Sequence, residues 1–133
     1  MTNTKLQKEV ANQLFRLGLK MTHNGYYYFK QGILIIIEKL KNHEVDSYKR
    51  VYYQIAEDFN KMDPNRNITY KCVSRSLTYT LKWLWNHGDQ QEINLVFGRN
   101  ATSLTPLTAI VIIANKIYED EGLEGLNNTF IKE

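Results

Sequence analysis

The chain of 133 residues is 43% hydrophobic and 23% charged, a composition typical of one globular domain with a sizeable core. Its net charge of +3 is too mild to identify a partner, and its single cysteine, Cys72, excludes an internal disulfide. The longest aliphatic run, Ile33 to Ile37, is too short to cross a bilayer, and no signal-peptide pattern opens the chain. We therefore expect a cytoplasmic protein with no membrane contact.

Apolar residues recur at helical spacing in six segments: 5–17, 26–42, 46–60, 69–86, 89–97 and 106–119. Gly18, Gly88 and Gly98 are placed to end three of these helices, and Thr105-Pro106 combines an N-cap residue with a proline at the first helical position. Segment 26–42 is ambiguous, because its isoleucines and tyrosines favour a strand by propensity. Its length and its charged end favour a buried helix, which is the alternative we adopt.

The remaining segments connect these helices. Asp46 and Ser47 are both suited to cap the third helix, and a loop around Asp63-Pro64-Asn65 precedes the fourth. Residues 120–133 are expected to form a loose tail. We predict a single all-α domain over residues 1–133, with about six helices in a compact bundle that contains a helix-turn-helix.

The fourth helix is the most informative element, because the stretch from Asn65 to Gly88 contains no acidic residue. On a helix of about 3.6 residues per turn, one face combines cations and hydroxyls: Lys71, Ser74, Arg75, Thr78 and Lys82. Another face is apolar and suits a core: Val73, Leu77, Leu81 and Leu84. A basic face without carboxylates is typical of a helix that enters a groove lined by phosphates.

The third helix, a loop and this basic helix follow the helix-turn-helix plan. Ile55, Ala56 and Phe59 would pack against the apolar face of the basic helix, and the small Ala56 permits a close crossing. By spacing alone, an ordinary solvated basic helix is an equally good interpretation.

Several motifs occur in a fixed order along the chain: Gly18 seven residues before Gly25-Tyr26-x-Tyr28, Tyr53-x-Ile55-Ala56-x-x-Phe59-Asn60, Val73-x-Arg75 with Leu77 and Leu81, Trp85-x-x-Gly88 with Ile93-x-x-x-Phe97-Gly98, and Pro106 with Ala114-x-Lys116. Together they resemble the C-terminal DNA-binding domain of the sporulation initiation response regulator (sporulation stage zero protein A). The resemblance covers about residues 14–117. It implies a transcriptional regulator that binds double-stranded DNA, associates with the nucleoid and forms a homodimer on tandem sites.

The resemblance places Arg75 where the family reads a guanine, and an arginine fork can donate to both O6 and N7 of that base. Ser74 and Thr78 are expected beside it as base-reading residues, although the family has glutamate and arginine there. We expect phosphate contacts from five further cations: Lys71, Lys82, Arg50, Arg66 and Arg99. The family's phosphorylated receiver domain has no counterpart here, so we expect a protein that is constitutively competent or is controlled by its own abundance or by a partner.

Other function classes find less support. No glycine-rich phosphate loop, nucleophile elbow or paired carboxylates occur, so we expect neither an enzyme nor a cofactor nor a small-molecule substrate. His23, His43 and His87 show no metal-ligand spacing with one another or with Cys72, which is expected to be a half-buried packing residue. The alternative function is a protein-interaction module or antagonist that pairs with a full-length regulator without reading DNA.

Overall fold

The computed structural model describes residues 4–44, 48, 50–99 and 101–122. Six α-helices form this part of the chain: α1 (Thr4–Leu17), α2 (Tyr26–Lys41), α3 (Val51–Met62), α4 (Tyr70–His87), α5 (Gln90–Phe97) and α6 (Pro106–Ile117). A 3₁₀ turn, η2 (Ala101–Ser103), precedes α6, and a π-helical turn, η3 (Tyr118–Gly122), continues it. The described residues contain no strand, so the all-α prediction is confirmed and segment 26–42 is a helix.

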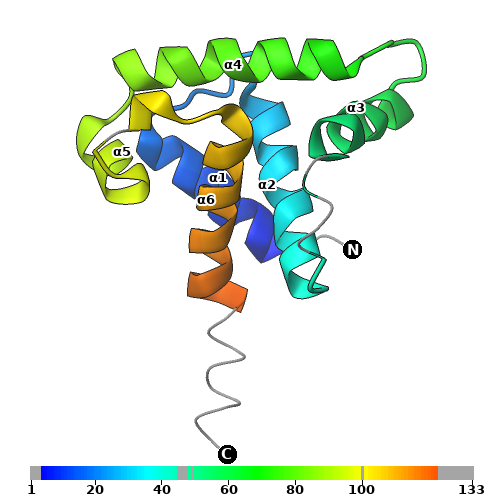
Figure 1. Ribbon diagram of the computed structural model, residues 1–133. Helices are drawn as coiled ribbons and strands as arrows, with labels where there is room; N and C mark the ends of the chain where they lie inside the picture. The colour runs from blue at the N-terminus through cyan, green and yellow to red at the C-terminus, as the bar shows by residue number, and fades with distance from the viewer. Residues whose placement is uncertain (1–3, 45–47, 49, 100, 123–133) are drawn as a thin grey trace, which may run out of the picture.

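The long helix α4 lies across one end of the molecule, with α3 and α5 beneath its two ends (Figure 1). Helices α2 and α6 pack side by side and run away from α4, which leaves the opposite side of α4 uncovered. Gly32 allows the close approach of α2 to its neighbours, because a Cβ there would lie 3.0 Å from Ile110 Cδ1 and 3.2 Å from Ile55 Cδ1. The core is therefore built between α2, α6 and the helices that flank them.

One hydrophobic cluster includes buried residues from all six helices. Its largest fully buried members are Phe29, Leu14, Leu17, Ile33, Ile36, Ile37, Ile55, Leu77, Ile110 and Ile113. Burying one such side chain contributes about 1.5–3 kcal/mol, so α4 is held in place mainly by its apolar side.

Local signals fix most helix ends. Gly18 has φ +96°, the left-handed conformation that ends α1, and Thr105 Oγ1 accepts a hydrogen bond from the amide of Thr108 at 3.2 Å to cap α6. Helix α3 begins at Val51, later than the predicted residue 46, and the proposed caps Asp46 and Ser47 lie outside the described residues. Of the residues predicted to form a loose tail, 120–122 belong to η3, and 123–133 lie outside the described range. No described helix is long and apolar enough to cross a membrane.

Candidate nucleic-acid interface

Helix α4 has a buried side and an uncovered side. Thr69 caps its start by accepting the amide hydrogen of Cys72 at 3.2 Å, and Gly88 follows its last residue. The predicted apolar face is confirmed, since Val73, Leu77, Leu81 and Leu84 are buried. The opposite side is exposed; we call it the outer face of α4, and it consists of Lys71, Cys72, Arg75, Thr78, Tyr79, Lys82 and Asn86.

The start of α4 is fixed to α3 by a two-point hydrogen bond. The Asn60 side chain donates from Nδ2 to the Ile68 carbonyl at 2.9 Å and accepts from the Ile68 amide at 2.8 Å. This clamp holds the end of the loop of seven residues, 63–69, against α3. Because Ile68 is buried directly before the cap residue Thr69, the clamp also sets the direction in which α4 leaves the loop. Helices α3 and α4 thus keep the order and contact expected of a helix-turn-helix.

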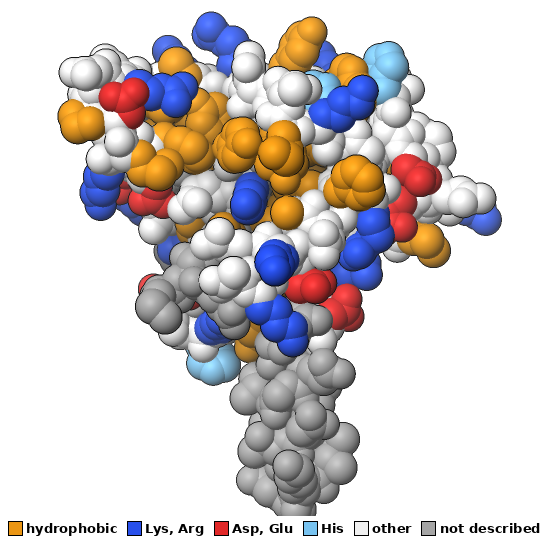
Figure 2. Space-filling model, turned by 180° about the vertical axis from the view of Figure 1, so that it is seen from behind, with side chains coloured by type: hydrophobic (Ala, Val, Ile, Leu, Met, Phe, Trp, Pro, Cys, Tyr) orange, Lys and Arg blue, Asp and Glu red, His pale blue; other side chains and the backbone are white. Residues whose placement is uncertain are grey.

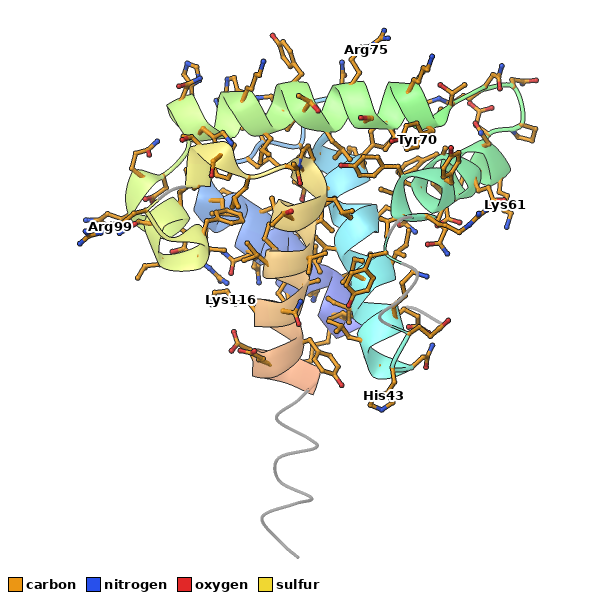
Figure 3. All side chains as sticks on the ribbon, viewed as in Figure 1. His43, Lys61, Tyr70, Arg75, Arg99 and Lys116 are labelled. Carbon is orange, nitrogen blue, oxygen red and sulfur yellow. The ribbon has the colours of Figure 1, made fainter. Side chains whose placement is uncertain are left out.

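The cations of the outer face point into solvent. Arg75 extends away from the body of the protein, and Lys71 and Lys82 are exposed one and two turns from it (Figure 3). Within the described part of the chain, no carboxylate forms an ion pair with any of these three side chains. Their charge is therefore available to an external anion.

The two hydroxyl residues predicted beside Arg75 are less available than expected. Ser74 is half-buried at the edge of the outer face. Thr78 is exposed, but its Oγ1 donates to the Ser74 carbonyl at 2.8 Å, so its proton is engaged within the helix. Both can still offer a hydroxyl oxygen as an acceptor.

The other predicted cations occupy different places. Arg50 is exposed at the start of α3, with its guanidinium 5.8 Å from the centre of the Tyr53 ring, and Tyr53 stacks on Tyr70 at 4.8 Å. Arg66 is exposed in the loop that precedes α4. Arg99 follows α5 and points away from the molecule near the other end of α4 (Figure 3). The structure therefore brings Lys71, Arg75 and Lys82 together and leaves Arg99 apart from them.

The segment between α1 and α2, residues 18–25, lies along α4, and sequence reasoning missed this contact. The Asp89 amide donates to the Leu17 carbonyl at 2.8 Å at one end of the segment. At the other end the Gly25 amide donates to Thr80 Oγ1 at 3.2 Å. Between segment and helix lies an open hollow of about 650 Å³, lined mainly by polar side chains: Thr22, His23, Asn24, Cys72, Arg75, Ser76, Tyr79 and Thr80.

The expectation that Cys72 is a half-buried packing residue is wrong, because Cys72 is exposed on the outer face. Thr69 Oγ1 donates to its sulfur at 3.3 Å, and hydrogen bonds from the Thr69 side chain and backbone lower the pKa of the thiol. The sequence places Cys72 beside Val73, and an α-helix turns neighbouring residues by about 100°, so one is exposed while the other is buried.

The described residues contain no group of three histidine, cysteine, aspartate or glutamate side chains that could hold a metal ion. A family model described as "Sporulation initiation factor Spo0A C terminal" matches residues 10–117, from the middle of α1 to the end of α6. No curated protein and no solved structure matches the chain.

Proposed function

The chain belongs to the family of the Spo0A C-terminal domain, and from that premise we propose that α4 is its recognition helix and enters the major groove of duplex DNA. The family is a DNA-binding effector domain that regulates transcription in sporulation, and it is not an enzyme family. The resemblance drawn from the ordered motifs is thus confirmed at the level of the family. The groove, the contact residues and the assembly on DNA remain our proposal.

One observation carries the proposal: the outer face of α4 is cationic, exposed and free of carboxylates, while the other side of the same helix is anchored in the core. A rigid helix that presents cations and neutral polar side chains without carboxylates is suited to a groove whose walls are phosphates. Arg75 lies centrally on this face, where a guanidinium fork can donate to both acceptors of a guanine edge. Ser74 and Thr78 flank it and would contact bases through their hydroxyl oxygens.

We assign the phosphate contacts to the cations around Arg75. Lys71 and Lys82 lie toward the two ends of α4, while Arg50 and Arg66 lie on the α3 side of the same interface. Arg99 would reach a phosphate only on DNA that extends or bends past α5, so we give it the smallest contribution. Binding as a homodimer on tandem sites, at the nucleoid, completes the proposal, and residues 1–133 would act as one DNA-binding domain.

The test is the affinity of the purified protein for a fluorescent duplex at about 50 and about 200 mM salt. Four phosphate contacts give a slope of about −3.6 in log affinity against log salt, hence a loss of about 150-fold over this range. Selection from a random-sequence duplex pool, followed by sequencing, should then enrich one motif.

A second candidate function is supported by the limited availability of Ser74 and Thr78, which offer few donors to a base. It is a protein-interaction module that pairs with a full-length regulator and does not read DNA. Absence of both salt-dependent binding and an enriched motif would refute the DNA-binding proposal. Co-elution with such a regulator, without retention on DNA, would then establish the module.

A further inference from the structure

We propose that His23 and His87, which both contact the Trp83 ring, form a protonation-dependent DNA phosphate contact that makes the affinity for DNA rise as the pH falls. The inference rests on the proposed function and adds a regulated contact to the same interface. It concerns residues that neither the helical pattern of α4 nor the family match assigns to DNA.

We call these three rings, which are in contact, the stack. The His23 and Trp83 ring centres are 4.1 Å apart with the planes tilted by 50°, and the Trp83 and His87 ring centres are 5.1 Å apart with the planes inclined by only 17°. In Figure 2 two histidine side chains lie at the upper edge of the molecule beside a hydrophobic one, and the third histidine lies near the bottom. Figure 3 labels that third residue, His43, at the end of the molecule opposite Arg75.

The fold holds this stack in place from both sides. His87 belongs to the last turn of α4, and its Nδ1 lies 3.2 Å from the Trp83 carbonyl. His23 belongs to segment 18–25, whose two ends are tied to α4 and to the residues after it by the hydrogen bonds of Gly25 and Leu17. His23 also lines the hollow that contains Arg75, so the stack adjoins the proposed base-reading centre.

Three features of the stack favour a cation when phosphate is present. An indole face attracts a cation within about 6 Å of its centre, and both imidazoles lie within that distance of Trp83. The C-terminal end of a helix favours positive charge, and His87 is located there. Imidazole is also the side chain that changes charge between about pH 5 and 8.

The surroundings leave the charge to be matched by DNA. Charged or titratable groups close to the stack in the chain are Lys20, Lys82 and Asp89, and the hollow that His23 lines also contains Cys72, Arg75 and Tyr79. Asp89 is the only carboxylate among these residues, and its Oδ1 accepts the Glu92 amide at 3.1 Å to cap α5. A DNA phosphate at the stack would be a further anion that an imidazolium could meet.

The size of the effect follows from proton linkage. If a phosphate binds the protonated imidazole about tenfold more tightly than the neutral one, the complex binds more protons than the free protein, and affinity rises as the pH falls. For each contacting histidine the gain is about sixfold between about pH 8 and about pH 6. Two histidines together would give a gain of up to about 40-fold.

The test measures affinity for one fluorescent duplex across this pH range at constant ionic strength. Wild type is expected to gain at least about sixfold toward low pH. The double variant H23Q/H87Q, which keeps polar side chains that do not titrate, should gain much less affinity toward low pH than wild type does. The matched control is His43→Asn, which removes the remote histidine and should keep the wild-type pH dependence. Asparagine is chosen because residue 43 has φ +60°, a conformation that asparagine tolerates.

The outcomes separate this proposal from the proposed function. Equal pH dependence in wild type and H23Q/H87Q, or none in wild type, would overturn the histidine contact while leaving DNA binding in place. Absence of binding at every pH would overturn the proposed function and this inference with it. Imidazole resonances recorded by NMR, with and without DNA, give a readout on wild-type protein that needs no variant to fold. DNA is expected to change the resonances of His23 or His87 and to leave those of His43 unchanged; equal changes for all three would refute the contact.

Discussion

Replacing Gly25 by alanine should separate segment 18–25 from α4 and lower the stability of the whole protein. Gly25 has φ −83°, which any residue can adopt, so the cost comes from contact and not from backbone conformation. A Cβ there would lie 2.3 Å from Thr80 Oγ1, 2.8 Å from Thr80 Cβ and 2.9 Å from the Ser76 carbonyl oxygen. Two of these three atoms belong to the rigid frame of α4, so the segment must move outward.

The expected cost can be worked from these contacts. Overpacking costs about 1–3 kcal/mol. Loss of the 3.2 Å hydrogen bond from Gly25 to Thr80 adds about 0.5–1.5 kcal/mol. Alanine also reduces the conformational entropy of the unfolded chain, which stabilises the folded protein by about 0.4–1 kcal/mol. The free energy of unfolding of Gly25→Ala should therefore fall by about 0.5–4 kcal/mol.

Urea unfolding followed by helical circular dichroism measures this change. The matched control is Asn24→Ala, an exposed neighbour on the same segment, which should alter stability by less than about 0.5 kcal/mol. The double variant Gly25→Ala/Thr80→Ala loses the 2.3 Å contact, so its cost should be smaller than the sum of the single costs by about 1 kcal/mol. A cost for Gly25→Ala no larger than that of the control would refute the close contact between segment 18–25 and α4.

Three further predictions concern the interface and its surroundings. Lys82→Ala should weaken binding to all DNA sequences about equally and reduce the salt slope by about one. The control is Lys116→Ala, which should change neither quantity, because Lys116 pairs with Asp120 at 3.6 Å. A salt slope unaltered by Lys82→Ala would show that Lys82 does not contact a phosphate. Cys72 should react with N-ethylmaleimide faster than an ordinary exposed thiol, because hydrogen bonds from Thr69 lower its pKa. The adduct, one turn from Arg75, should block DNA binding. Full binding by the alkylated protein would mean that DNA binds to another part of the surface. Burial raises the pKa of Tyr52 to about 12, whereas the pKa of tyrosine in an unfolded chain is near 10, so the free energy of unfolding should fall as the pH rises between about 10 and 12. Alkaline unfolding experiments should show a smaller fall for Tyr52→Phe. An identical fall in the variant would contradict this prediction.

The fold was largely predictable because its helices carry local signals. Thr105-Pro106 marked the start of α6, and Gly18 marked the end of α1, since caps and left-handed glycines act within a few residues. Segment 26–42 was correctly predicted as a helix despite its strand propensity, because its length fits a helix better than a strand. The predicted start of α3 at residue 46 differs from the observed start at Val51, where Arg50 is the N-cap residue.

The candidate site was predictable only where it depends on one helix. The period of α4 correctly separated buried Leu77 from exposed Arg75. It could not show that Ser74 is half-buried, because that depends on how neighbouring elements cover the edge of the face. The contact between His23 and Trp83 joins residues far apart in the sequence, and only the folded chain brings these rings together. The Asn60 clamp on Ile68 is likewise set by the conformation of the loop.

The central claim is that Arg75 on the outer face of α4 reads a base in the major groove. The most direct test compares the motifs that wild type and Arg75→Ala enrich from the same random-sequence duplex pool. We predict that wild type enriches a motif with a fixed guanine and that the variant loses preference at that position alone, a loss of about 1–3 kcal/mol in discrimination, while it keeps its salt-dependent affinity. A variant that enriches the same motif with the same guanine would contradict the base-reading role of Arg75, because another residue would then read that base.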